Sequence, residues 1–149
     1  MIFNERLIDH LRELGEVRSL SIEKAMRTVD RGDFEPQNTS PYADRAQPIG
    51  YGATISAPHM HAIALEALNH KLIPGVKILD VGCGSGIMCA YLVRALEQKN
   101  RNDEVNATIV GIEHINELTV MAKRNLNKNH MKFMLKDTIK IIGKFKNNI

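Results

Sequence analysis

Cysteine is scarce in this sequence, and long apolar runs are absent. Cys83 and Cys89 lie six residues apart, without further Cys or His residues at the spacing of zinc ligands, so neither a cystine framework nor a zinc site is expected. The first residues lack the cationic region and apolar core of a signal peptide, and no run reaches the roughly 18 apolar residues of a membrane span. We therefore expect reduced thiols and a cytoplasmic protein outside the membrane.

An excess of one charge is also nearly absent. The 20 Lys and Arg residues against 17 Asp and Glu residues give a net charge of +3, too small and too scattered to indicate a nucleic acid or a membrane surface as partner. With 149 residues, of which 44% are hydrophobic, the chain fits one globular domain that can form a core without disulfides or metal. We expect no metal site.

The first third of the chain predicts two helices and a loop. Over residues 4–15, apolar residues recur at helical spacing, and Gly15 can end the helix. A second amphipathic helix is expected up to Gly32, with Ser21 as its N-terminal cap. Residues 33–58 then contain four prolines, which favours an irregular loop or binding segment over regular structure.

A third helix is expected to begin at Pro58, with its cap near Ser56 or Ala57. The residues that give it helical spacing are Met60, Ile63, Ala64, Ala67 and Leu68. His59 and His61 lie in its first turn, but without a carboxylate or a third histidine at ligand spacing they do not indicate a metal site. For His61, an ordinary surface or capping histidine is the alternative to a ligand contact.

Two strand–helix units follow. Residues 76–81 are short, apolar and β-branched, which is typical of a strand buried on both faces. A glycine-rich turn and a helix over residues 87–96 come next, and a strand over 108–113 and a helix over 115–127 repeat the order. Parallel strands need helical crossovers, so this alternation predicts an α/β domain with a parallel sheet.

The turn after the first of these strands is typical of a nucleotide-binding segment. Gly82, Gly84, Ser85 and Gly86 leave the backbone open to a ligand. The spacing is not the G-x-G-x-x-G of dinucleotide-binding proteins, and no lysine follows as in a P-loop. A turn that binds nothing is the alternative.

Two acids stand beside this turn. Asp80 precedes it, and Glu113 ends the next strand, where a carboxylate can accept hydrogen bonds from both ribose hydroxyls of a nucleoside. Two carboxylates would repel a pyrophosphate and suit a cationic methionine group. The pair therefore favours S-adenosyl-L-methionine over a nicotinamide dinucleotide as cofactor.

Residues 49–62 read IGYGATISAPHMHA and carry a specific resemblance. This run, within a similarity from about residue 4 to about residue 126, resembles the protein-L-isoaspartate (D-aspartate) O-methyltransferase family. The resemblance implies a class I methyltransferase fold, a Rossmann-like three-layer α/β sandwich in one domain, with helices and a substrate loop in 1–58 and the βα core in 59–149. It places the active-site serine at Ser56. The cofactor positions it implies are Ala53, Thr54, Ile55, Ser56, His61, Asp80, Glu113 and His114, beside the turn residues Gly82, Gly84, Ser85 and Gly86.

The reaction that the resemblance implies is methyl transfer to the free α-carboxylate of L-isoaspartyl and D-aspartyl residues in damaged proteins. The methyl ester formed in this way then collapses to a succinimide. A carboxyl group with an ordinary pKa near 4 is already ionised at neutral pH, so no strong base is needed. Ser56 would orient the carboxylate with one hydrogen bond. A helix cap is the alternative role for Ser56. Isoaspartyl-containing proteins and peptides are the expected partners, and the resemblance implies a monomer for an intact family member.

The resemblance fades after Leu126, where family members continue through further strands. Residues 131–135 predict one more strand, and Asp137 is a candidate for the acid that contacts an adenine ring in related methyltransferases. We expect an incomplete sheet with an unpaired edge, and hence self-association, weak cofactor binding and slow turnover. A catalytically inactive module that binds an adenosyl ligand or a partner is the alternative function. The glycine spacing disfavours an NAD-dependent dehydrogenase.

Overall fold

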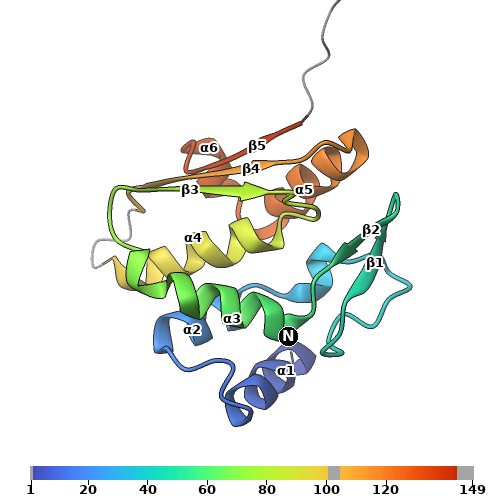
Figure 1. Ribbon diagram of the computed structural model, residues 1–149. Helices are drawn as coiled ribbons and strands as arrows, with labels where there is room; N and C mark the ends of the chain where they lie inside the picture. The colour runs from blue at the N-terminus through green and yellow to red at the C-terminus, as the bar shows by residue number, and fades with distance from the viewer. Residues whose placement is uncertain (1, 101–104, 144–149) are drawn as a thin grey trace, which may run out of the picture.

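The computed structural model describes residues 2–100 and 105–143 as helices packed on one side of a parallel sheet (Figure 1). The strands, in sheet order, are β3 (Val76–Val81), β4 (Ala107–Ile112) and β5 (Ile139–Ile142). Both strand pairs are parallel, with Val76 opposite Ala107 and Ile109 opposite Ile139. Helices α4 (Ile87–Lys99) and α5 (Asn116–Asn129) follow β3 and β4 along the chain. The predicted α/β fold with a parallel sheet is therefore confirmed.

Helix α4 lies between the sheet and the N-terminal helices (Figure 1). A helix in such a place is apolar around most of its circumference, and its buried residues are Ile87, Cys89, Ala90, Tyr91, Leu92, Val93, Ala95 and Leu96. The core therefore runs continuously from the sheet through α4 to the N-terminal helices.

The two predicted N-terminal helices are present as α1 (Ile2–Glu13) and α2 (Leu20–Thr28). The predicted cap at Ser21 is wrong. The cap position of α2 is Ser19, two residues earlier, and the hydroxyl of Ser19 donates to Glu66 Oε2 at 2.6 Å. The backbone N–H groups of Arg18 and Ser19 donate to Glu66 Oε1 at 2.8 and 2.7 Å. Glu66, from a helix distant in the sequence, thus accepts the hydrogen bonds of the donors that precede α2. Residue spacing along α2 itself cannot predict this contact.

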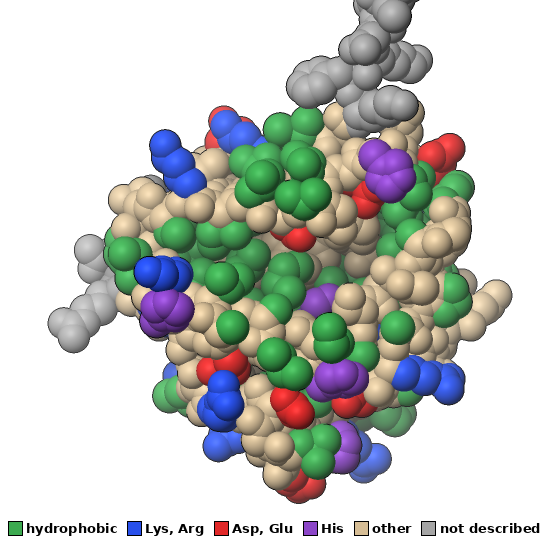
Figure 2. All heavy atoms as spheres, in the orientation of Figure 1, with side chains coloured by type: hydrophobic (Ala, Val, Ile, Leu, Met, Phe, Trp, Pro, Cys, Tyr) green, Lys and Arg blue, Asp and Glu red, His purple; other side chains and the backbone are tan. Residues whose placement is uncertain are grey.

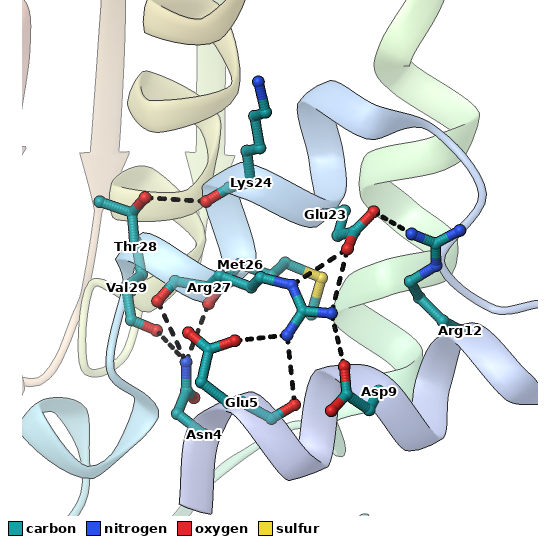
Figure 3. Close-up of polar contacts among 10 residues, drawn as sticks. All are labelled: Asn4, Glu5, Asp9, Arg12, Glu23, Lys24, Met26, Arg27, Thr28 and Val29. Carbon is teal, nitrogen blue, oxygen red and sulfur yellow. Dashed lines mark hydrogen bonds and ion pairs between the residues drawn. The ribbon is translucent and has the colours of Figure 1, made fainter. Parts of the chain in front are cut away.

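Asn4 and Arg27 join α1 to α2 (Figure 3). The side-chain amide of Asn4 is buried and donates to the carbonyl oxygens of Met26 at 3.1 Å and Val29 at 3.3 Å, at the open C-terminal end of α2. The guanidinium of Arg27, which is 24% exposed, forms ion pairs with three acids. These acids are Glu5, Asp9 and Glu23.

Residues 33–58 are more regular than predicted. A 3₁₀ helix, η1, covers Arg31–Phe34, and β1 (Gln47–Gly50) pairs antiparallel with β2 (Ala53–Ile55). The hairpin closes through Tyr51 and Gly52, whose φ angles of 54° and 71° are both positive, as two-residue hairpin turns require. The expectation of an irregular segment is therefore wrong at 47–55, where a tight turn outweighs Pro48.

Helix α3 (Pro58–Leu68) begins where predicted but buries a different face. Its buried residues are Pro58, His61, Ala62 and Leu65, whereas Met60, Ile63 and Leu68 are exposed. The helix packs on α2 and α4 through this buried face. The face contains His61, which a hydrophobicity pattern does not include among apolar residues.

The strand predicted over residues 131–135 is wrong. These residues form the short helix α6 (Met131–Leu135), and the strand is β5. In α6 only Phe133 is buried, and Arg94 and Lys132 lie over its ring at 5.1 and 4.7 Å from the centroid. In β5, burial alternates along Ile139–Ile142, the pattern of a strand with one covered face.

Asp137 lies just ahead of β5, at the amino end of the sheet, with an exposed side chain near Lys140 Nζ at 3.7 Å. The glycine-rich turn follows the carboxyl end of β3, at the opposite end of the parallel strands. The proposed contact between Asp137 and an adenine ring is therefore wrong.

The face of the sheet away from α4 has no cover among the described residues. Leu79 and Val81 are 61% and 71% exposed, so the expectation that β3 is buried on both faces is wrong. The cause is the layering, since α4 and α5 supply side chains to one face only. Figure 2 shows hydrophobic side chains gathered around the edge formed by β3. Within the described residues, no helix has the length and apolarity to cross a bilayer.

Candidate functional site

Two adjoining cavities open at the carboxyl ends of the parallel strands. The larger, of about 490 Å³, is lined by Val81, Gly82, Ile112, Glu113, His114, Ile142 and Gly143. The smaller, of about 240 Å³, is lined by Thr54, Ile55, Ser56, His61, Asp80, Val81, Gly82, Cys83, Gly84, Ser85, Ile87 and Met88. Val81 and Gly82 belong to both linings. Ligands of open α/β sheets bind at this end of the strands.

The glycines of the turn have different physical roles. Gly82, Gly84 and Gly86 have φ angles of +77°, +52° and +85°, which other residues rarely adopt. A Cβ on Gly82 would meet no atom within 4 Å, so this glycine faces open space in both cavities. A Cβ on Gly86 would lie 3.2 Å from the Ala122 Cβ of α5. Gly82 therefore suits ligand approach, and Gly86 serves the packing of the turn on α5.

Glu113 is buried and fixes the turn against the end of β4. Its Oε2 accepts a hydrogen bond from the Gly84 N–H at 3.0 Å, and its Oε1 accepts the N–H groups of His114 and Ile115 at 2.8 and 3.0 Å. A carboxylate oxygen can accept two hydrogen bonds, so Oε2 keeps capacity for a ligand hydroxyl. The same residue can therefore order the turn and contact a ribose.

Asp80 is half-buried at the floor of the smaller cavity. Burial raises its pKa above the ordinary value of 3.8, and the charge of Glu113 raises it further, while the Cys89 thiol, 3.6 Å from Oδ2, opposes this by donating a hydrogen bond. Burial and the same acids raise the pKa of Cys83 to about 12. The Cys83 thiol is therefore neutral and has no nucleophilic character at neutral pH.

Ser56 is exposed to the smaller cavity rather than used as a helix cap. The cap position of α3 is Ala57, and Asp44 Oδ1 accepts the backbone N–H of His59 at 2.9 Å, the function a capping side chain would have. Within the described residues, no side chain or backbone group forms a hydrogen bond with the Ser56 hydroxyl. Of the two predicted cap positions, Ala57 is confirmed and Ser56 is wrong, so the Ser56 hydroxyl is available to a ligand.

His61 lies behind Ser56 on α3 and is 7% exposed. Burial lowers its pKa from 6.5 to about 3, and the charge of Arg31 acts in the same direction. The ring is therefore neutral at physiological pH and carries one N–H donor. It cannot take up a proton as a general base near neutral pH.

The cavities bring together most of the predicted site residues. Ala53 lies in β2 and Gly86 in the turn, but neither lines a cavity. Analysis of the sequence missed Arg31 and Glu35, which lie directly behind Ser56 and His61. Arg31 and Glu35 stand in the mostly polar run of residues 30–35, so the sequence around them does not indicate that they are buried. Among the described residues, no three His, Cys, Asp or Glu side chains are arranged to hold a metal ion.

The protein-family model described as protein-L-isoaspartate(D-aspartate) O-methyltransferase matches residues 2–144. Curated relatives include the protein-L-isoaspartate O-methyltransferases of Caenorhabditis elegans, 42% identical over 139 residues, and Triticum aestivum, 42% identical over 134 residues. These alignments cover 93% and 90% of this chain but 58% and 55% of the relatives. The chain thus spans somewhat more than half the length of these relatives.

Solved structures show the same fold. A Plasmodium falciparum protein assigned to the protein-L-isoaspartate O-methyltransferases, crystallised in complex with S-adenosyl-L-homocysteine, superposes with a TM-score of 0.84 and 29% identity, covering 98% of this chain and 65% of that chain. A further protein-L-isoaspartate O-methyltransferase, with a TM-score of 0.71 and 22% identity, supports the fold alone. With a family match over residues 2–144, this chain belongs to the protein-L-isoaspartate(D-aspartate) O-methyltransferase family.

Proposed function

We propose that this chain carries the site of a repair methyltransferase, which transfers a methyl group from S-adenosyl-L-methionine to the free α-carboxylate of L-isoaspartyl and D-aspartyl residues. The observation that carries the proposal is the free hydroxyl of Ser56 in one cavity with Asp80 and the open Gly82. The S-adenosyl-L-homocysteine bound to the Plasmodium falciparum protein supports the choice of cofactor.

The described residues suit this cofactor chemically. Glu113 would accept a hydrogen bond from a ribose hydroxyl through Oε2, and the apolar side chains of Ile112 and Ile142 would contact the adenine in the larger cavity. Asp80 would complement the positive charge of the methionine part in the smaller cavity. When bound, S-adenosyl-L-methionine supplies a methyl group on a positively charged sulfur.

The residues around Ser56 suit an anionic nucleophile. An isoaspartyl carboxylate is already ionised at neutral pH, so no base is needed, and the neutral His61 and Cys83 are compatible with such a nucleophile. S-adenosyl-L-methionine would supply its methyl group to one carboxylate oxygen, and the electron pair of the broken carbon–sulfur bond would stay on sulfur. Ser56 would donate one hydrogen bond that orients the carboxylate in line with the methyl group.

We also propose that the substrates are isoaspartyl-containing proteins and peptides and that the compartment is the reducing cytosol. Both cysteines are free and buried, as a reducing compartment permits. The partner surface for a peptide is the mouth of the smaller cavity, where Thr54 and Ser56 are exposed.

The test removes the Ser56 hydroxyl. Ser56→Ala should lower methyl transfer to an isoaspartyl peptide by about tenfold or more, the value of a hydrogen bond to a charged group. S-adenosyl-L-homocysteine affinity, measured by calorimetry, should change by less than about twofold, because the serine faces the substrate. Ser21→Ala, which removes a hydroxyl bonded to Asn69 outside the cavities, is the control.

Equal transfer rates in Ser56→Ala and the parent would contradict the role of Ser56. A parent chain that binds S-adenosyl-L-homocysteine but transfers no methyl group to any isoaspartyl peptide would be an adenosyl-ligand-binding module, and the proposed function would be wrong.

A further inference from the structure

Arg31 is a fully buried arginine directly behind the candidate site. Its side chain has no exposed surface, and it comes from the 3₁₀ helix η1, which lies outside both cavities. A buried guanidinium is costly unless its donors are used. The hydrogen bonds and ion pair of Arg31 therefore indicate its structural role.

Two of these contacts reach site residues. Nη2 of Arg31 donates to the carbonyl oxygen of Ser56 at 2.9 Å, and Nη1 lies 3.3 Å from Nδ1 of His61. One side chain thus contacts Ser56, the residue before the Ala57 cap of α3, and the imidazole in the first turn of that helix. The planar guanidinium fixes both directions at once, which a lysine ammonium cannot do.

Glu35 holds the other side of Arg31. Its Oε1 lies 2.8 Å from Arg31 Nε, and its side chain is 1% exposed. The distance is that of an ion pair, but within the described residues neither Arg31 Nε nor the Glu35 oxygens form a hydrogen bond of acceptable geometry. A buried pair left incomplete in this way is weak support for stability, so a positioning role explains its presence better.

The contact with Arg31 also determines which nitrogen of His61 carries the proton. A guanidinium has only N–H donors, so Nδ1 of His61 must be the acceptor and Nε2 must carry the hydrogen. The charged and titratable groups around the ring are Arg31 from η1, Tyr91 from α4 at 5.8 Å between ring centroids, and Asp80, which lines the same cavity from β3. A protonated ring would place N–H against N–H beside a buried cation.

We propose that Arg31, held by Glu35, is a positioning residue of the site, which anchors Ser56 through its carbonyl oxygen and fixes His61 as the Nε2–H tautomer. His61 then offers a ligand one hydrogen-bond donor, the group that a carboxylate oxygen accepts. The low pKa of His61, about 3, agrees with this arrangement. The expected effect on catalysis rests on the proposed function, whereas the tautomer of His61 does not.

The first measurement is long-range ¹⁵N–¹H NMR of the histidine rings in the full 149-residue chain. His61 should show a protonated Nε2 and an unprotonated Nδ1, without titration between about pH 5 and 8. A His61 that is protonated at Nδ1, or that titrates near 6.5, would overturn the proposal even if the chain transfers methyl groups.

The second measurement uses the double substitution Arg31→Met with Glu35→Met, which removes both charges and leaves neither buried alone. Both tautomers of His61 should appear, its pKa should rise, and the kcat of isoaspartyl-peptide methylation should fall about tenfold, with the KM for S-adenosyl-L-methionine within about twofold. The control, Arg27→Met with Glu23→Met, removes another, partly buried pair at the same i,i+4 spacing away from both cavities and should change none of these. An unchanged tautomer and kcat in the Arg31 variant would contradict the proposal.

Discussion

Asp80 is the residue whose ionisation a cationic ligand would control most directly. It is half-buried, and burial followed by the charge of Glu113 raises its pKa above 3.8. A positive methionine group favours the ionised carboxylate, so ligand binding and proton loss from Asp80 are coupled. The affinity for the cationic ligand is therefore highest above the raised pKa of Asp80, and it falls as the pH drops through that pKa.

We therefore predict that the affinity for S-adenosyl-L-methionine, whose sulfur carries the positive charge, weakens on acidification at a pH above the ordinary aspartate value of 3.8. The loss should approach tenfold for each further pH unit. Calorimetry between about pH 4 and 8 measures it. Asp80→Asn should bind more weakly at neutral pH and lose this dependence, and the same pH profile in both proteins would contradict the role of Asp80.

At the scale of elements, the junction of α1 and α2 contains two kinds of polar contact (Figure 3). Asn4 is 1% exposed and satisfies carbonyl oxygens at the end of α2, whereas Arg27 pairs with three acids at the surface. Burial, rather than the number of partners, should decide which matters more for stability.

Asn4→Ala should lower the free energy of unfolding by about 2 to 3 kcal/mol, because it leaves buried carbonyl oxygens unsatisfied. Arg27→Ala should cost about 1 kcal/mol or less, since exposed ion pairs are screened by solvent and salt. Urea denaturation of both variants measures the difference. A greater loss in Arg27→Ala would show that the surface network holds these helices together.

The elements also show how far sequence patterns reach. The strands over 76–81 and 107–112 and the helices after them follow from local periodicity, and Asp80 and Glu113 follow from their places at the strand ends. The Glu66 contacts that replace a Ser21 cap come from a helix distant in the sequence. The buried face of α3 is likewise determined by its packing on α2 and α4. Arg31 could not be found because its burial arises only when η1 packs behind α3.

At the scale of the whole molecule, the face of the sheet that no described residue covers is the main departure from an ordinary α/β core. Parallel strands are normally covered on both faces, yet Leu79 and Val81 are largely exposed. Large apolar surfaces of this kind promote association in water.

We predict that the 149-residue chain self-associates through this face. The double substitution Leu79→Ser with Val81→Ser should reduce association in sedimentation velocity and change the free energy of unfolding by about 0.5 kcal/mol or less, because both side chains are already exposed. Leu14→Ser with Leu20→Ser, at exposed positions near the N-terminal helices, is the matched control and should leave association unchanged. A monomeric parent at all concentrations would contradict this prediction.

We propose that the cavities at the strand ends form an isoaspartyl methyltransferase site. The most direct test is transfer of labelled methyl from S-adenosyl-L-methionine to an isoaspartyl peptide and to its normal aspartyl twin. We predict slow transfer to the isoaspartyl peptide alone, as an ester that base hydrolyses to methanol, with less transfer in Ser56→Ala. Equal labelling of both peptides, or no labelling by a chain shown to bind S-adenosyl-L-homocysteine, would contradict it.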